Sequence, residues 1–438
     1  MTSPSPETSA AAAAGAPNRR TSLLVLLIGV LVLFIDGYDL FVLGTVGPSL
    51  ITDPEWHIAP TTIGTLGSLT ALGMPIGAIA TARMGDARGR RLPITLCLAW
   101  ISLCMLLSGL APGIGVFGLS RFLTGIGIGA LSPLVTALIV DWAPPRRRTL
   151  FVGVALSGIA LGGVVVACIG RAVLPGVHFQ TLFLVGLLPL LLVPVCWKAI
   201  PSHRPAYAAA PDTATPASAA TATAGEAESG WAALFAPGRR LAVVLFCLVA
   251  FLGLVLVYGA STWLPTLMIK AGYDLSSALE FTIAFNGGAI VGTLAVALLA
   301  DRGHLKTATL GLFTAAAVAM LVLTRHHDHN LILAMSALAG MGTLGTQNLV
   351  NAWVGRYFGP ELRGTALGFV IGLGRLGSIL GPSYLTYVTT VSVAPSAGFY
   401  AFVAPALLGA LAVAFIPTRR GDAAREDRAS ARPVSAEA

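Results

Sequence analysis

The sequence predicts an all-α integral membrane protein with about twelve transmembrane helices in two six-helix halves related by an internal repeat. Hydrophobic residues make up 55% of its 438 residues and charged residues only 11%, whereas a soluble domain carries about 25% charged residues. Twelve apolar runs are each long enough to cross a bilayer core, which takes about 20 helical residues. The two halves of the chain also match at one constant spacing.

Each apolar run predicts one spanning helix. The first run follows Arg19 and Arg20 and has the outline of a signal peptide, but it continues through Asp36 to Leu50 without a clear cleavage site, so we predict an uncleaved helix. The chain contains 50 glycines, which suits membrane helices that pack closely on small residues. The predicted spans are 22–46, 61–83, 92–111, 114–141, 149–170, 180–200, 241–263, 277–300, 307–324, 330–355, 364–389 and 396–417.

The segments between and beyond the spans predict the domain organisation. Residues 1–20 and 419–438 are rich in Ala, Ser, Pro and charged residues, and we expect disordered cytoplasmic tails there because they cannot bury enough apolar surface to fold. Residues 201–239 contain a similar stretch, which predicts a cytoplasmic linker. The N-terminal half is then 21–200 and the C-terminal half 240–418.

A shift of 215 residues places the first half on the second. Parallel halves of this kind characterise one large transporter fold, in which the substrate path lies between them. The matched pairs are Gly73 and Gly288, Gly77 and Gly292, Asp86 and Asp301, Gly125 and Gly340, Gly127 and Gly342, Pro145 and Pro360, Arg148 and Arg363, and Gly153 and Gly368.

The distribution of Lys and Arg predicts the orientation. With the N-terminus in the cytoplasm, 22 of the 27 basic side chains fall on cytoplasmic segments and 3 on external ones. Cytoplasmic loops of membrane proteins carry such an excess. We therefore expect a multi-pass protein of the bacterial inner membrane with both termini in the cytoplasm. The net charge of +8 then reflects topology, so we expect no nucleic-acid partner.

Four charged residues lie deep inside predicted spans, where charges are costly and usually functional. At 1.5 Å per residue, Asp36 and Arg121 lie about 20 Å from the cytoplasmic face and Arg375 about 18 Å. Asp36 and Asp39 are three residues apart and share one helix face. The pattern predicts a buried acid–base cluster facing a central cavity, in which the two acids carry protons and either Arg375 or Arg121 binds an anionic substrate. Structural ion pairing is the alternative.

Other polar residues at membrane depth are further candidates. Asn286, beside two glycines, and Tyr258 are candidate substrate contacts, although interfacial anchoring explains Tyr258 and Trp263 as well. Three amides of the tenth span either line the cavity or join helices by hydrogen bonds. These amides are Gln347, Asn348 and Asn351.

The loop after the second span is rich in charge. Asp86 can pair with neighbouring arginines or cap a nearby helix, and such contacts can break when the halves rock. Charges that only set the topology are the alternative. The basic neighbours are Arg83, Arg88, Arg90 and Arg91, with Gly89 between them.

These motifs resemble the major facilitator superfamily and, within it, the aromatic acid:proton symporter family of 4-hydroxybenzoate and benzoate transporters. Asp36-Gly37-Tyr38-Asp39 matches that family's D-G-x-D signature, and the resemblance covers about residues 20–418. Asp86–Arg91 resembles the superfamily loop G-x-x-x-D-R-x-G-R-R, except that Ala82 replaces the leading Gly and Ala87 the first Arg. The resemblance implies that Asp86, Gly89, Arg90 and Arg91 form a conformational latch.

Three further segments carry the resemblance. Arg121 with its following glycines resembles the fourth-span motif, with Asp141 in the usual acidic place before Pro144. The glycine-rich segment around Arg375 is similar to the eleventh span of the aromatic-acid branch. Trp263-Leu-Pro265 is expected to end the seventh span, as is common there.

The predicted function is import of a small aromatic carboxylate, of the benzoate, hydroxybenzoate or protocatechuate class, together with protons by alternating access. No GxxxxGK[ST] loop occurs, so a gradient rather than ATP drives the process. The alternatives are proton-coupled transport of another organic acid, a sugar-like metabolite or a drug, and a non-transporting sensor. We expect no enzymatic activity, cofactor or metal, and a functional monomer whose partners are substrate, protons and the lipid bilayer.

Overall fold

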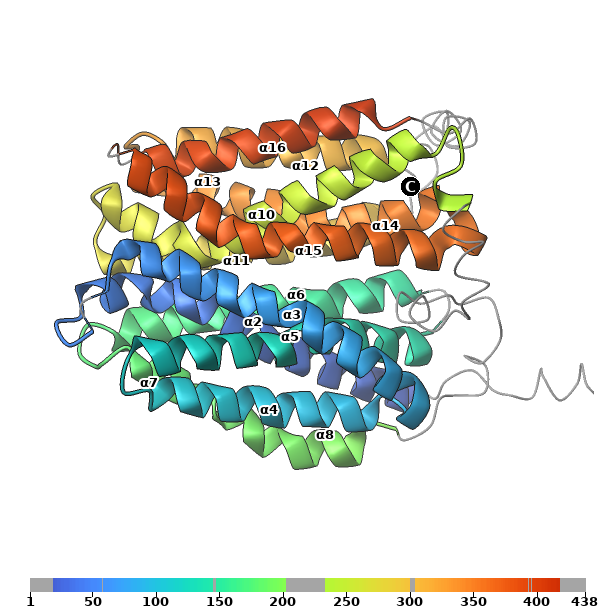
Figure 1. Cartoon of the computed structure of the whole chain (residues 1–438), viewed down its shortest axis with the longest axis horizontal. Coiled ribbons are helices and arrows are strands. Elements are labelled where there is room, and N and C mark those ends of the chain that lie inside the picture. The colour runs from blue at the N-terminus through green and yellow to red at the C-terminus, as the bar shows by residue number, and fades with distance from the viewer. Residues whose placement is uncertain are drawn as a thin grey trace, which may run out of the picture.

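The structure is a computed structural model that describes residues 19–56, 58–144, 147–201, 233–299, 304–392, 394 and 396–417. Within these ranges the chain forms helices and turns and no strand. The helices lie side by side in an elongated bundle (Figure 1). Eleven helices of the described chain are long and apolar enough to cross a membrane. The predicted all-helical membrane fold is confirmed.

The N-terminal half supplies six spans, of which the sixth is broken. Pro189 and Pro194 stand at the beginnings of its second and third pieces, where a missing N–H and a fixed φ end the preceding helix. The predicted span 180–200 is therefore three short helices in one line. The elements of this half are α2 (Arg19–Thr52), α3 (Pro60–Arg88), α4 (Arg91–Gly109), α5 (Ile114–Trp142), α6 (Arg148–Val173), and the sixth span made of α7 (Gln180–Val185), η2 (Leu188–Leu192) and α8 (Val193–Ala199).

The C-terminal half also supplies six spans, and its fourth contains a π-turn, η6. This turn interrupts the predicted span 330–355, so that no single α-helix of spanning length occurs there. Single π-turns inside helices frequently mark functional sites. The elements are α10 (Arg240–Lys270), α11 (Leu275–Leu299), α12 (Leu305–Val322), α13 (His329–Gly340), η6 (Met341–Gly345), α14 (Thr346–Tyr357), α15 (Gly359–Val391) and α16 (Ala397–Phe415).

The seventh span is longer than the sequence suggested. The expectation that Trp263-Leu-Pro265 ends it is wrong, because α10 continues to Lys270 with Pro265 inside the helix. Trp263 is fully buried, and its indole N–H donates to the carbonyl oxygen of Pro382 at 3.0 Å. Because its indole N–H is hydrogen-bonded inside the bundle, Trp263 does not mark the membrane–water interface or the end of the helix.

The internal repeat is visible in the closest helix contacts. In each half, glycines of two neighbouring helices face backbone of the partner helix with no room for a Cβ. The contacts of the second half lie 215 residues after those of the first, the same spacing that relates the two halves of the sequence. They are Gly73 on Phe122 and Gly288 on Ala337, Gly77 on Ile126 and Gly292 on Met341, and Gly125 on Thr70 and Gly340 on Phe285.

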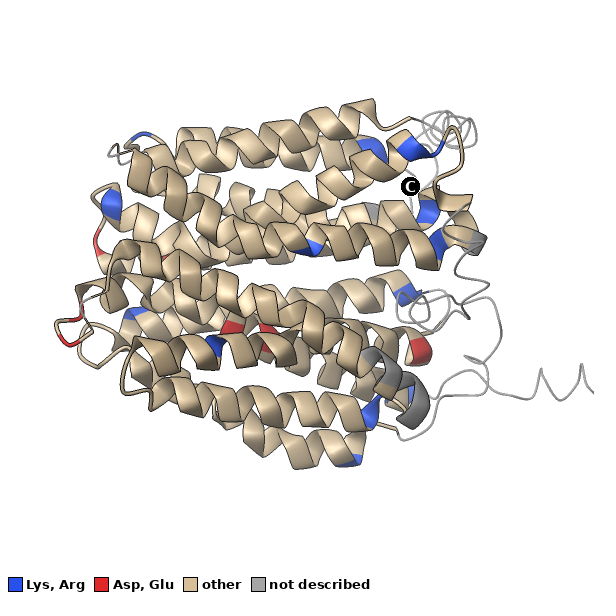
Figure 2. Cartoon of the chain, viewed as in Figure 1, with Lys and Arg blue, Asp and Glu red and all other residues tan. Residues whose placement is uncertain are grey.

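The two halves meet mainly along three helix pairs, α6 with α11, α3 with α15, and α2 with α10, and α3 also touches α10. One end of the bundle carries residues 53–56 and Lys270 and is called the loop end. The opposite end carries Arg19 and Arg148 and is called the terminal end. Lys and Arg gather mainly at the terminal end (Figure 2).

Contacts between the halves are tight toward the loop end. Ser68 of α3 donates to the carbonyl oxygen of Ile379 in α15 at 2.6 Å, and its hydroxyl lies 2.7 Å from that of Ser383. Gly44 of α2 faces the carbonyl oxygen of Ser261 in α10 with no space for a Cβ.

Toward the terminal end, by contrast, the halves enclose space. A cavity of about 240 Å³ lies between α5 and α6 of one half and α11 and α14 of the other, with Arg148 and Asn348 in its wall.

Candidate functional site

The first element of the candidate site is a buried ion pair within the N-terminal half. Arg121 Nη1 of α5 lies 2.9 Å from Asp39 Oδ1 of α2, and each side chain is 1% exposed. Because the two side chains touch, Asp39 and Arg121 lie at the same depth in the bundle. An ion pair so deep is costly to form unless its remaining hydrogen-bonding groups are satisfied.

Arg121 has further partners on its own helix and on neighbouring ones. Its Nη2 donates to Ser108 Oγ at 2.7 Å, to Thr124 Oγ1 at 3.1 Å and to Met105 Sδ at 3.3 Å. The guanidinium also lies over the ring of Phe183, 4.8 Å from its centroid. Arg121 is therefore held as part of the fold of this half. Asp39 Oδ2, in contrast, is buried and has no hydrogen-bond partner among the described residues.

The second acid, Asp36, lies one helical turn from Asp39 and has a different partner. Ser132 Oγ of α5 donates to Asp36 Oδ2 at 2.6 Å. Asp36 is buried and lies close enough to Arg375 and Asp39 to interact with both electrostatically. Asp36 therefore has a hydroxyl partner within its own half and an electrostatic interaction with Arg375 of the other half.

The residues between the two acids fix the position of α2. Gly37 faces the carbonyl oxygen of Ile159 in α6, so closely that a Cβ would overlap it. Tyr38 OH donates to the carbonyl oxygen of Leu182 at 2.8 Å. The D-G-Y-D segment therefore packs α2 against the fifth and sixth spans while it holds both acids toward α5.

Arg375 lies at the contact between the two halves. Its Nη1 lies 3.2 Å from Met74 Sδ of α3, and Tyr258 OH of α10 lies 3.3 Å from the same sulfur. Arg375 and Tyr258 also interact electrostatically. Within the described ranges Arg375 forms no ion pair. The site thus contains one arginine with a carboxylate partner and one without.

There is space beside Arg375. Gly372 lies three residues earlier in α15, so the two residues share a helix face. A Cβ added to Gly372 would meet no atom within 4 Å. Arg375 itself is half-buried. A cation that is partly withdrawn from water, unpaired and next to open space can accept a carboxylate in a two-pronged hydrogen bond.

Asn286 lies elsewhere on the interface between the halves. It is fully buried in α11, its Nδ2 donates to the carbonyl oxygen of Thr282 at 3.0 Å, and its Oδ1 has no partner among the described residues. Its amide oxygen lies where a Cβ on Gly163 of α6 would stand. These contacts place Asn286 in the α6–α11 packing rather than beside Arg375.

Among the three amides of α14, Asn348 takes both of the predicted roles. Asn348 Nδ2 donates to Thr293 Oγ1 of α11 at 3.3 Å, so it joins helices and borders the 240 Å³ cavity. The side-chain oxygens of Gln347 and Asn351 are buried without a partner in the described chain. Gln347 packs on Gly253 of α10.

The predicted latch is described only in part. The side chain of Asp86 lies outside the described residues. Arg90 Nε lies 3.8 Å from Asp141 Oδ2, and both side chains are buried. The Arg91 guanidinium lies over the Trp197 ring at 4.2 Å. Gly89 has φ 74°, a left-handed conformation that glycine adopts without strain. Arg90 and Arg91 are therefore engaged within the N-terminal half, and the side chains of Arg83 and Arg88 lie outside the described residues.

Sequence reasoning missed several partners of the charged residues. Ser132 holds Asp36, Met74 joins Tyr258 and Arg375, and Ser108 holds Arg121. A usable signal existed for the two serines, because a hydroxyl inside an apolar span at the depth of a charge has few other partners. Met74 carried no such signal, since methionine is ordinary in a membrane helix.

The model of the Major Facilitator Superfamily matches residues 29–302 and 281–437. A gentisate transporter from Corynebacterium glutamicum is 34% identical over 92% of this chain and 88% of its own length. A benzoate transport protein from Acinetobacter baylyi is 30% identical over 90% of each chain.

Solved structures show the same fold. The crystal structure of a D-xylose–proton symporter aligns with a TM-score of 0.70, covering 91% of this chain and 99% of the symporter at 18% sequence identity. An inward-facing bacterial homologue of the lysosomal transporter Spinster aligns with a TM-score of 0.65, covering 94% of this chain and 98% of that one at 18% identity. At such identities the likeness concerns the fold alone.

Proposed function

Because this chain belongs to the Major Facilitator Superfamily, within its group of aromatic acid transporters, we propose that it imports a small aromatic carboxylate together with protons. It is a multi-pass membrane transporter and not an enzyme. The curated relatives are named for gentisate and benzoate, which supports a substrate that joins one aromatic ring to one carboxylate.

The observation that carries this proposal is the unpaired Arg375 between the halves. A carboxylate that leaves water needs a charged partner, and the planar guanidinium supplies two parallel N–H donors. Tyr258, joined to Arg375 through Met74, offers an aromatic face and a hydroxyl next to that anchor. Arg121 is the weaker candidate, because Asp39 already occupies its Nη1.

The two acids supply the proposed coupling to protons. Asp36 lies within electrostatic reach of Arg375, so an ionised Asp36 competes with a substrate carboxylate for the same cation. Protonation of Asp36 removes that competition and favours substrate binding. After the halves rock, loss of the proton restores the competing charge and expels the substrate. Asp39, paired with Arg121, is the second candidate proton carrier.

The direction of opening follows from the proposed orientation. With the termini in the cytoplasm, the contacts of Ser68 with Ile379 and Ser383 close the external side, and the 240 Å³ cavity between the halves lies toward the cytoplasm. The structure then corresponds to a state closed to the outside. Asp86 and its basic neighbours lie at the cytoplasmic side, where we propose that they act as the latch.

Uptake into proteoliposomes tests the proposal. Purified protein is reconstituted, and accumulation of radiolabelled benzoate, 4-hydroxybenzoate, gentisate and protocatechuate is measured with and without an imposed inward proton gradient. We expect accumulation of at least one acid to rise as the external pH falls, and to collapse when an uncoupler is added. Uptake that does not depend on the proton gradient would contradict proton coupling. The absence of uptake for all four acids would contradict the proposed substrate class.

A further inference from the structure

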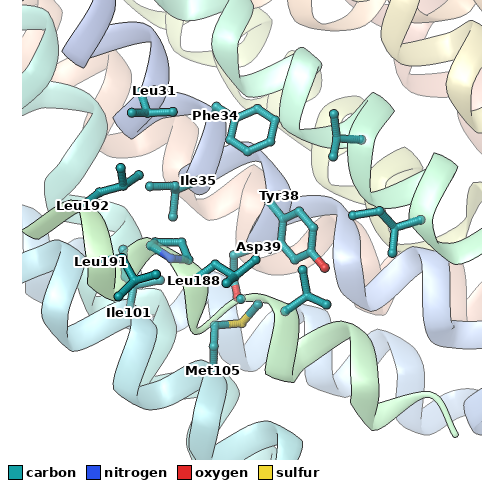
Figure 3. A pocket seen from close by; sticks show the side chains of 15 residues that line it. Leu31, Phe34, Ile35, Tyr38, Asp39, Ile101, Met105, Leu188, Leu191 and Leu192 are labelled. Carbon is teal, nitrogen blue, oxygen red and sulfur yellow. The ribbon is translucent and has the colours of Figure 1, made fainter. Parts of the chain in front are cut away.

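Two cavities of the described chain differ in the charge that their walls carry. The larger, about 350 Å³, lies among α2, α4, α6 and the broken sixth span (Figure 3). Its wall is almost wholly apolar, and Asp39, the one acid in it, is 2% exposed and paired with Arg121. Nothing in that wall selects a ligand. The smaller cavity, about 240 Å³ between the halves, has a different chemistry.

An unpaired arginine lines the smaller cavity. Arg148, the first residue of α6, is the one charged residue among those that form its wall in the described chain. It is half-buried, and within the described ranges its side chain forms no ion pair and no hydrogen bond. A guanidinium that is partly withdrawn from water and has no partner favours an anion beside it, because its planar donors match an oxyanion.

The internal repeat provides a second copy of this arginine for comparison. Arg148 corresponds to Arg363, which lies 215 residues later. Arg363 Nε donates to the carbonyl oxygen of Gly355 in α14 at 2.9 Å. The residue that corresponds to Gly355 is Val140 of α5, which lines the cavity, but Arg148 Nε makes no such bond. The same arginine is therefore bonded to the fold in one half and unbonded beside a cavity in the other.

The rest of the wall comes from both halves and, among the described residues, contains no acid. Its polar groups are those of Thr149 in α6, Thr293 in α11 and Asn348 in α14. Pockets for drug-sized ligands have volumes of about 300–1,000 Å³, so a cavity of about 240 Å³ suits a smaller molecule. A small anion with one apolar ring matches the charge, the surface and the size. The apolar side chains are Val140, Val152, Leu156, Val296, Ala297 and Ala352.

We propose that this cavity is a second carboxylate site, which the aromatic acid occupies on its way to the cytoplasm; the identity of this ligand rests on the proposed function. The terminal N–H groups of Arg148 donate to the carboxylate, and the ring packs on the apolar side chains of α6 and α11. No residue of α15 lines the cavity, so the site is separate from Arg375. An acid expelled from Arg375 then meets a second cation before it leaves the protein.

Equilibrium binding tests the site directly. Radiolabelled benzoate and gentisate are titrated onto the full-length protein in nanodiscs of zwitterionic lipid at about pH 7, where a carboxylic acid with a pKa of about 4 is ionised. We expect two molecules bound per protein at saturation. In Arg148→Gln the affinity of one site should fall by about tenfold or more, as the loss of a charged hydrogen-bond donor implies. In Arg375→Lys the other site should weaken while the Arg148 site is retained.

Matched variants separate the charge from the space. Arg147 precedes Arg148, is exposed and is not part of the wall, so Arg147→Gln should keep both sites. Val152 of α6 lines the cavity, so Val152→Phe fills it and should remove the second site although Arg148 is intact. Leu150, on the same helix, is 38% exposed and outside the wall, so Leu150→Phe should bind as the wild type does.

Several outcomes would overturn the proposal. Two unaltered sites in Arg148→Gln or in Val152→Phe would show that the second molecule binds elsewhere. Displacement by acetate as effective as displacement by benzoate would show that the apolar wall recognises no ring. Loss of the second site in nanodiscs of anionic lipid would assign Arg148 to a lipid phosphate.

The same titrations separate this site from the proposed anchor. One bound molecule that is lost in Arg148→Gln and unaffected in Arg375→Lys would support the second site while it contradicts the anchor. One bound molecule that depends on Arg375 alone would overturn the second site and leave the proposed function intact. No binding of either acid would contradict both.

Discussion

Asp39 Oδ1 and Arg121 Nη1 lie 2.9 Å apart, and their side chains are sealed inside one half of the protein. Asp36, one turn away on the same helix, instead accepts a hydrogen bond from Ser132 and lies within electrostatic reach of Arg375 in the other half. Two acids on one helix face thus serve different partners: Asp39 is bound into the fold, and Asp36 lies where the halves meet.

This difference predicts different consequences for the two amide variants. Asp39→Asn leaves the buried Arg121 without a counter-charge, and removing one partner of a buried pair costs about 3–5 kcal/mol. We expect a clear fall in the melting temperature of the purified protein. Asp39→Asn with Arg121→Met removes both charges, and should recover much of the lost stability. If Asp39→Asn melts like the wild type, the pair is not structural.

Asp36→Asn should fold normally, because an amide oxygen can still accept from Ser132 and the neighbouring Arg375 is half-buried. We expect it to lose accumulation of substrate against a gradient but to retain exchange of labelled for unlabelled substrate, since exchange needs no net proton movement. Counterflow and gradient-driven uptake in the same proteoliposomes distinguish the two. Should both Asp36→Asn and Asp39→Asn still accumulate substrate, the proton site lies elsewhere, and Asp141 is the next acid to test.

Arg375→Lys keeps the positive charge but loses the planar fork. Hydrogen bonds to charged groups contribute about 1.5–3 kcal/mol each, so we expect the apparent affinity for substrate to fall by about tenfold or more. Arg325→Lys, at an exposed position after α12, is the control for expression and insertion. Unchanged affinity in Arg375→Lys would move the anchor to Arg121.

Paired cysteines at positions 68 and 383 should lock the closed side. The two serine hydroxyls lie 2.7 Å apart across the halves, which is compatible with the Cβ separation of about 3.5–4.5 Å that a disulfide needs. Oxidation of Ser68→Cys/Ser383→Cys should abolish uptake, and reduction should restore it. Each single variant, treated in the same way, is the control. A cross-linked protein that still transports would exclude opening at this end.

Substitution of Asp86 tests the proposed latch. Asp86→Asn should leave membrane insertion intact but reduce transport severely, because a neutral amide cannot pair with the neighbouring arginines as a carboxylate does. Asp86→Glu keeps the charge and should retain more activity. Wild-type rates in Asp86→Asn at equal expression would show that these charges only set the topology.

The sequence by itself determined the class of the protein and the level of its buried charges. The length of an apolar run shows where a helix crosses the membrane, and the rise per residue gives the depth of each side chain within it. Both are local properties of the sequence, so Asp39 and Arg121 could be placed at a similar depth without a structure. The constant 215-residue spacing likewise matched glycines in the two halves, and the structure shows that these glycines make equivalent helix contacts.

Only the tertiary structure decided which charge meets which partner. Asp36 and Asp39 share a helix face, so either could have paired with Arg121; the choice depends on how α2 and α5 are rotated and shifted against each other, and no local pattern encodes that. The same holds for Met74 between Tyr258 and Arg375. These contacts join residues of different helices, so they exist only after the helices have packed.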